Sequence, residues 1–89
     1  MNIELESLTI YNNNITDVGA IELANTMVGN TTLRILNLQM NFIKDKGGEA
    51  FIKGLEEHQY KDIWKIILLD NQCTEAFKRK VKKYESIVL

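Results

Sequence analysis

The apolar residues of this chain recur in one pattern that is repeated along its length. The first pattern comprises Leu5, Leu8, Ile10, Asn13, Ile15 and Gly19. Each of these positions recurs 28 residues later, as Leu33, Leu36, Leu38, Asn41, Ile43 and Gly47. A third occurrence follows after a further 30 residues, as Ile63, Ile66, Leu68, Asn71 and Cys73. Agreement at so many positions predicts three tandem structural units.

Each unit is expected to begin with a short strand and a corner. Apolar residues alternate at a period of two, which predicts strands with one buried side. The asparagine after each strand can satisfy backbone groups at a corner through its side-chain amide, and stacked units would form a ladder of such residues. We expect this ladder to consist of Asn13, Asn41 and Asn71.

A helix is expected after each corner, because apolar residues then follow at helical spacing. The candidate N-cap residues are Thr16 or Asp17 in the first unit, Asp45 in the second and Thr74 in the third. The apolar stripes comprise Ala20, Leu23, Ala24 and Met27, then Ala50, Phe51, Ile52 and Leu55, then Ala76, Phe77, Val81 and Tyr84. One strand and one helix per unit predict an α/β fold with parallel strands.

The pattern L-x-x-L-x-L-x-x-N-x-L, with a glycine at the helix start and an alanine-rich stripe, resembles the leucine-rich repeats of the ribonuclease-inhibitor-like type. The resemblance covers about residues 5–84. It implies a single domain over residues 1–89, with units at about 5–32, 33–62 and 63–89. It also implies a short solenoid, with a parallel three-stranded sheet on the concave face and helices on the convex face. Phe77 replaces the glycine of the first two units, which suggests that the third unit terminates the array.

The resemblance also implies a function, because relatives of this type bind proteins mainly through the strand face. The outward positions between the buried leucines are therefore candidate protein-binding residues: Tyr11, Ile35, Asn37, Gln39, Met40, Lys65, Ile67, Leu69 and Asp70. The apolar members would be buried by a partner, and the polar members would set its orientation. The alternative is that residues 85–89 or the last helix cover Ile67 and Leu69.

The first unit begins only four residues after the initial methionine, which leaves no room for a polar unit that caps its strand. We therefore expect an uncovered edge. Three explanations stay open: a longer array, a partner that covers the end, or a homodimer paired through the first strands. The alternative function is accordingly a structural repeat block that self-associates or forms part of a longer array.

The charge of the chain gives no global reason to expect nucleic acid or an anionic membrane as a partner, since its net charge is −1. The N-terminus has no signal-peptide pattern, and no apolar run is long enough to span a membrane. We expect an intracellular, cytoplasmic protein. Five cations within residues 78–83 are expected to form a solvated helix face. Nuclear import or a nucleic-acid contact is the alternative for this stretch.

Candidate chemistry is sparse. A single cysteine, Cys73, and a single histidine, His58, support neither a disulfide nor a metal site. The chain contains no phosphate-binding loop, dinucleotide glycine pattern or H-E-x-x-H motif. We therefore expect no enzymatic activity, no cofactor and no metal. Since some proteins of this repeat type act on small GTPases, an arginine that reaches a nucleotide is a further alternative, with Arg34 and Arg79 available.

Overall fold

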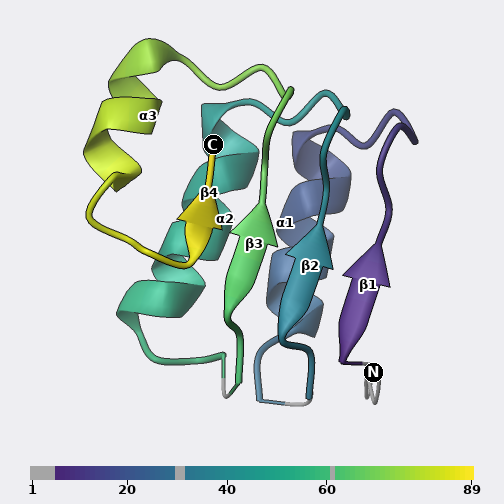
Figure 1. Ribbon diagram of the computed structural model, residues 1–89, viewed down its shortest axis with the longest axis vertical. Coiled ribbons are helices and arrows are strands. Elements are labelled where there is room, and N and C mark those ends of the chain that lie inside the picture. The colour runs from purple at the N-terminus through teal and green to yellow at the C-terminus, as the bar shows by residue number, and fades with distance from the viewer. Residues whose placement is uncertain (1–5, 30–31, 61) are drawn as a thin grey trace.

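The fold alternates strands and helices along the chain. The computed structural model describes residues 6–29, 32–60 and 62–89. In order, its elements are β1 (Ser7–Thr9), α1 (Asp17–Thr26), β2 (Ile35–Asn37), α2 (Asp45–Glu56), β3 (Lys65–Ile67), α3 (Glu75–Val81) and β4 (Ile87–Val88). Figure 1 shows the strands side by side, from β1 in purple to β4 in yellow, with α1 and α2 behind them. The predicted α/β architecture is confirmed.

The sheet is parallel throughout, and its register follows the spacing of the sequence pattern. Leu8 lies opposite Leu36, and Leu36 lies opposite Ile66. Equivalent residues of the three units are therefore neighbours across the sheet. Their side chains must all point to the same face, because orientation alternates along each strand.

The described residues form a sheet of four strands, whereas three strands were predicted. Ile87 and Val88 form β4, which pairs in parallel with β3 and continues the order β1-β2-β3-β4. The N–H of Ile66 donates to the carbonyl of Ser86 at 2.7 Å, and the N–H of Leu68 donates to that of Val88 at 2.8 Å. The end of the chain thus lies beside β3 and satisfies its backbone donors. The alternative that this segment covers the outer side of β3 is not what the structure shows.

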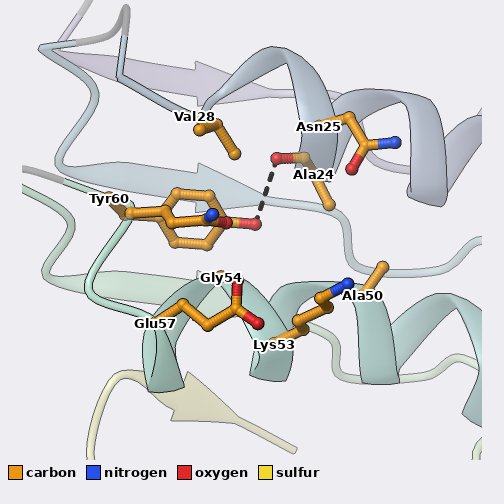
Figure 2. A pocket seen from close by; sticks show the side chains of 9 residues that line it. Ala24, Asn25, Val28, Ala50, Lys53, Gly54, Glu57 and Tyr60 are labelled. Atoms are coloured by element: carbon orange, nitrogen blue, oxygen red, sulfur yellow. Dashed lines mark hydrogen bonds between the residues drawn. The ribbon is translucent and has the colours of Figure 1, made fainter.

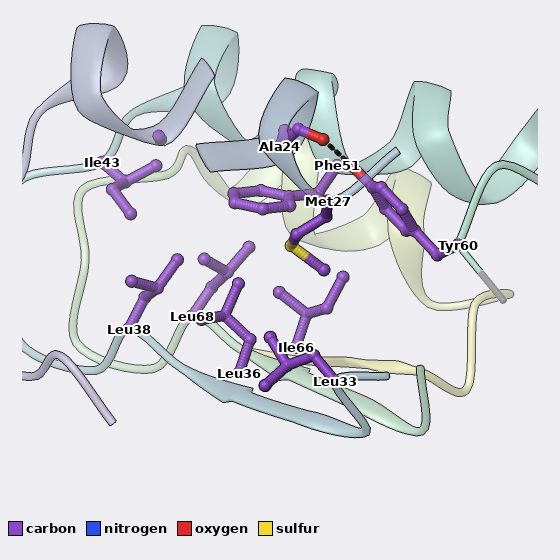
Figure 3. Close-up of a cluster of buried hydrophobic side chains, with 11 residues drawn as sticks. Ala24, Met27, Leu33, Leu36, Leu38, Ile43, Phe51, Tyr60, Ile66 and Leu68 are labelled. Carbon is purple, nitrogen blue, oxygen red and sulfur yellow. Dashed lines mark hydrogen bonds between the residues drawn. The ribbon is translucent and has the colours of Figure 1, made fainter. Parts of the chain in front are cut away.

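The hydrophobic core lies between the sheet and the helices. Figure 3 shows Leu36 and Leu38 of the second unit beside Ile66 and Leu68 of the third, facing Phe51 of α2. All five side chains are fully buried. Burial of a large apolar side chain stabilises the fold by roughly 1.5–3 kcal/mol. The alternation predicted for these two strands is therefore confirmed.

Two aromatic rings fill space that glycines leave on α2. A Cβ atom at Gly48 would lie 2.6 Å from Cζ of Phe77, and a Cβ at Gly54 would overlap the ring of Tyr60. The departure from the pattern at Phe77 is thus compensated by Gly48, which replaces an alanine of the first unit. Phe77 and Val81 of the short helix α3 are buried, whereas Ala76, which was assigned to the same apolar stripe, is exposed.

The N-cap prediction is confirmed for the third helix and wrong for the second, and in the first helix Thr16, one of the two predicted residues, holds the N-cap position without a side-chain hydrogen bond. Thr74 accepts a hydrogen bond from the N–H of Phe77 at 3.2 Å. The N-cap residues of α1 and α2 are Thr16 and Lys44, and neither side chain caps its own helix.

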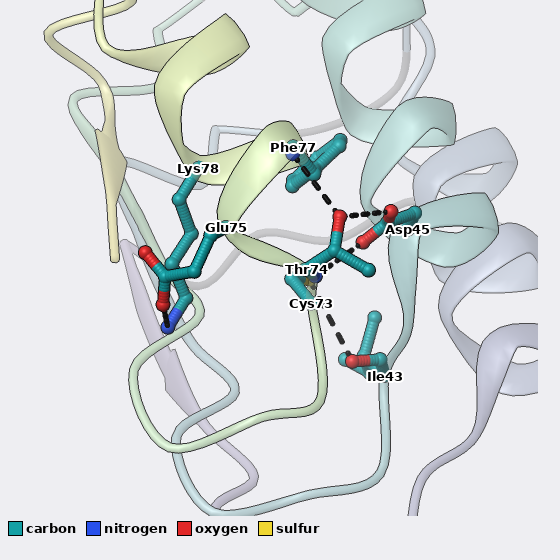
Figure 4. Close-up of polar contacts among 7 residues, drawn as sticks. All are labelled: Ile43, Asp45, Cys73, Thr74, Glu75, Phe77 and Lys78. Carbon is teal, nitrogen blue, oxygen red and sulfur yellow. Dashed lines mark hydrogen bonds and ion pairs between the residues drawn. The ribbon is translucent and has the colours of Figure 1, made fainter.

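The two aspartates instead bind the start of the next helix along the chain. Asp17 Oδ1 accepts from the N–H groups of Lys44 at 2.7 Å and Gly47 at 3.0 Å. Asp45 accepts from the N–H of Thr74 at 2.8 Å and from its hydroxyl at 2.6 Å, as Figure 4 shows. Equivalent positions of successive units lie side by side. The carboxylate in the first turn of α1 therefore reaches the start of α2, and the carboxylate in the first turn of α2 reaches the start of α3.

Candidate protein-binding face

The outward residues of the strands form rows across the sheet. One row contains Thr9, Asn37, Ile67 and Val88, in the order of the strands. We define the strand face as the side of the sheet opposite the helices. The candidate residues on it are Tyr11, Ile35, Asn37, Gln39, Lys65, Ile67 and Leu69, with Met40 and Asp70 three residues beyond the C-terminal ends of β2 and β3. Val88 belongs to the same face and was missed, because β4 was not predicted.

The apolar members of the strand face do not form one cluster. Ile67, Leu69 and Val88 are half-buried on the two neighbouring strands β3 and β4. Tyr11 is exposed at the far end of β1. The second unit separates them, because Gln39 lies between Tyr11 and Leu69 and Asn37 lies between Thr9 and Ile67. The structure therefore brings together the apolar residues of β3 and β4 and leaves Tyr11 apart.

The polar members of the strand face are held by hydrogen bonds. Gln39 Nε2 donates to Asp70 Oδ2 at 3.0 Å, across from the second unit to the third. Asn37 Oδ1 accepts from the N–H of Gln39 at 3.0 Å. Lys65 Nζ donates to the carbonyl of Glu85 at 3.3 Å and is thereby held toward β4. These groups are oriented by the chain itself.

Met40 has a backbone conformation that does not suit its side chain. Asn12, Met40 and Asp70 occupy equivalent positions and have φ values of 58°, 61° and 57°. Asparagine and aspartate enter this left-handed region readily, whereas other L-residues incur a cost of roughly 1–2 kcal/mol. Met40 is 49% exposed, so burial offsets only part of this cost.

A second exposed apolar patch lies at the loops that lead from the strands to the helices. Val18 and Phe42 are exposed there, and with Thr16, Lys44 and Gln72 they line a shallow hollow. Sequence reasoning missed this place. The signal for it was available, since Phe42 stands where the other units have the polar residues Asn14 and Gln72.

A further hollow lies between α1 and α2, and Tyr60, which lines it, has a structural role. Figure 2 shows Tyr60 between α1 and α2, with its hydroxyl directed at the backbone of Ala24. This hydroxyl donates to the Ala24 carbonyl at 3.1 Å. Burial raises the pKa of Tyr60 to about 12. Tyr60 therefore stays protonated at neutral pH and helps to join the two helices.

The basic stretch at residues 78–83 is partly neutralised by the chain itself. Lys78 lies 3.5 Å from a carboxylate oxygen of Glu75, and Lys80 lies 2.5 Å from one of Glu49. Lys83 Nζ lies 5.3 Å from the ring centroid of Tyr84. These contacts support the interpretation of a solvated helix face.

Arg34 also contacts another side chain. Its guanidinium lies 4.7 Å from the ring centroid of Trp64, which itself is exposed. Stacking of this kind occupies one face of the guanidinium.

The residues with potential chemistry are not brought together. The Cys73 thiol donates to the Ile43 carbonyl at an Sγ···O distance of 3.7 Å. Its pKa is raised to about 11, first by burial and then by the carboxylates of Asp45 and Asp17. Within the described ranges, no three histidine, cysteine or acidic side chains gather to hold a metal ion. Among these same residues, no helix is long and apolar enough to cross a membrane.

Comparison with known proteins supports the repeat pattern. Residues 2–24 and 29–51 each match the family model described as leucine-rich repeat, and together they make up more than half of the chain. No curated protein matches the sequence.

Proposed function

Because the chain belongs to the leucine-rich repeat family, whose repeats generally mediate protein–protein interaction and are typically not catalytic, we propose that its strand face binds another protein. We also propose that the repeats are of the ribonuclease-inhibitor-like type and that the sheet forms the concave side of a short solenoid. The partner would contact the residues of the strand face defined above.

The observation that carries this proposal is Met40. Its left-handed backbone lowers stability relative to the asparagine or aspartate of the neighbouring units, and about half of its side chain is exposed. A residue that costs stability and gains little burial is typical of a functional position. In this proposal the Met40 side chain is buried by the partner.

The chemistry of the strand face suggests how binding would occur. Ile67, Leu69 and Val88 offer an apolar group that is already half-buried, so a partner would complete its burial. The hydrogen-bonded pair of Gln39 and Asp70 joins the second and third units, and its members are the chain neighbours of Met40 and Leu69. Polar side chains that are oriented in advance lose less entropy when they bind.

An affinity-capture experiment tests the proposal. Proteins retained by the wild-type chain from a lysate of its source would be compared with those retained by Ile67→Asp and Asn25→Asp. Both substitutions add one negative charge, but Asn25 lies on the exposed side of α1. We expect Ile67→Asp to lose the partner and Asn25→Asp to keep it. Identical sets for both variants would refute binding through the strand face.

Met40→Asn gives a second and sharper test. Asparagine tolerates the left-handed backbone, so we expect stability to rise by roughly 0.5–1 kcal/mol. We expect the affinity for the captured partner to fall at least about tenfold, because an interface side chain is lost. The two effects would be measured by urea unfolding and by titration. A variant that is stabilised and binds equally well would remove the evidence that carries the proposal.

A second candidate function is self-association through the ends of the array. It is favoured by the position of β1, beyond which no strand lies among the described residues. In this candidate function the outer side of β1 pairs with a strand of another molecule.

A further inference from the structure

The last strand resembles the first strand in sequence. Residues 85–89 read Glu-Ser-Ile-Val-Leu, and residues 6–10 read Glu-Ser-Leu-Thr-Ile. Two residues are identical, and the two inward apolar positions are kept. The register also corresponds, since Leu8 lies opposite Leu36 of the next strand and Ile87 lies opposite Ile66 of the preceding one. A β1 strand is thus chemically suited to the place that β4 occupies beside β3.

The hydrogen bonds at this place follow the pattern between the other units. The N–H of Ile10 donates to Asn37, and the N–H of Leu38 donates to Ile67. The N–H of Leu68 donates in the same way to Val88. The fit of β4 is nevertheless incomplete, because Ile87 and Leu89 are only half-buried and line a hollow against α3 with Val81.

The first unit carries an asparagine that matches the backbone of the third unit. Asn41 Oδ1 accepts from the N–H of Ile15 in the unit before it, and Asn71 Oδ1 accepts from that of Ile43, both at 2.9 Å. Among the described residues, the Asn13 side chain bonds only to the carbonyl of Tyr11. The N–H of Cys73 is equivalent to the N–H groups of Ile15 and Ile43. Asn13 Oδ1 of another molecule would accept a hydrogen bond from it.

A carboxylate and a hydroxyl match in the same way. Asp45 accepts from the backbone and hydroxyl of Thr74 in the unit after it. Glu75 occupies the position equivalent to Asp45, and its side chain is 77% exposed and, within the described ranges, makes only a surface ion pair to Lys78. Thr16 occupies the position equivalent to Thr74, and its hydroxyl does not cap its own helix. Glu75 of one molecule would therefore meet Thr16 of another.

We propose that the β3 edge of one molecule accepts the first unit of a second molecule, head to tail, in place of β4. Leu8 and Ile10 of the second molecule would take the places of Ile87 and Leu89. This inference deepens the self-association candidate. Its contact surface is the β3 edge and not the strand face, although Thr9 of the second molecule would take the place of Val88 in the outward row. Residues 84–89, here called the tail, compete for the edge from within the chain. A tethered segment acts at an effective concentration in the millimolar range, so the tail keeps the edge occupied in dilute protein.

Release of the tail tests the proposal. The double substitution Ile87→Ser with Leu89→Ser removes the apolar side chains that hold β4 against the core. We expect the mass measured by light scattering to rise with protein concentration for this variant. At the same concentrations the wild type should stay lighter, with self-association at least about tenfold weaker because of the competing tail.

Two substitutions at one residue provide the matched control. Ile10 donates its N–H to Asn37, so the backbone of Thr9 points to the opposite, outer side of β1. Thr9→Pro removes the outer N–H and should return the tail-released variant to a monomer. Thr9→Val keeps that N–H and should leave the assembly intact.

A second route covers the case in which the double variant does not fold. Val88 accepts from Leu68, so its own N–H also faces β3, and Val88→Pro should eject β4 with Ile87 and Leu89 unchanged. A folded tail-released protein that stays monomeric at every concentration would overturn the proposal. Assembly of the tail-released variant that persists with Thr9→Pro would overturn it as well. Either result leaves the strand-face proposal standing, because that is tested by capture with Ile67→Asp.

Discussion

Replacement of Asn41 by alanine should destabilise the protein far more than the same replacement at Asn13. The two residues hold equivalent positions in the sequence pattern, but their surroundings differ. Asn41 is only 4% exposed, and its amide connects the first two units. Its Oδ1 accepts from the N–H groups of Asn13 and Ile15, and its Nδ2 donates to the carbonyls of Ile10 and Leu38.

The size of the effect follows from the groups that would be left without a partner. The Leu38 carbonyl also accepts from Asn71, so it stays satisfied, and the N–H of Asn13 can turn to water. The N–H of Ile15 and the carbonyl of Ile10 are half-buried and lose the contacts described. A buried unsatisfied group costs about 1–3 kcal/mol, so we expect a loss of roughly 2–4 kcal/mol. A domain of this size has only about 4–13 kcal/mol in total.

Urea unfolding, followed by circular dichroism, measures this difference directly. Asn13 is exposed and, among the residues that the structure describes, its side chain donates only to the carbonyl of Tyr11, so Asn13→Ala should cost less than about 0.5 kcal/mol. The comparison requires equal denaturant slopes for the two variants, which would show that the unfolded states are similar. Equal losses for the two variants would refute the reasoning, as would a loss below about 1 kcal/mol for Asn41→Ala.

Two further predictions concern ionisable groups. The pKa of Cys73 is raised from 9.0 to about 11, so its alkylation by iodoacetamide near neutral pH should be on the order of a hundredfold slower than in urea-unfolded protein; equal rates would contradict this burial. The pKa of Tyr60 is raised from 10.0 to about 12, so the unfolded state loses its proton first and stability should fall as the pH rises from 10 to 12. Tyr60→Phe should flatten this part of the profile, and an unchanged profile would point to another group.

The parts of the fold that could be predicted are those that a repeated register determines. Once Leu8, Leu36 and Ile66 are recognised as equivalent, parallel strands must place them side by side, and the alternation on each strand then assigns the inward and outward positions. The same logic located the residues of the strand face. It also located the asparagine ladder, in which Asn71 and Asn41 bond to the unit before them.

The parts that could not be predicted depend on distances in space or on very short segments. Two residues of β4 are too few for a periodic signal, although a comparison with residues 6–10 would have revealed them. A carboxylate such as Asp17 can cap its own helix or a neighbouring one, and only the spacing of the units decides between them. At the site, the left-handed backbone of Met40 could have been inferred, because Asn12 and Asp70 hold the equivalent positions.

The hydrogen bonds between units run in both directions, and this has a consequence for how the chain folds. Asp17 completes the start of the second helix, while Asn41 completes the corner of the first unit. Each of the two units therefore completes backbone hydrogen bonds of the other, and part of the stability of each comes from the boundary between them. Folding should accordingly be cooperative across the units, and a substitution at one boundary should unfold the segments on both sides together.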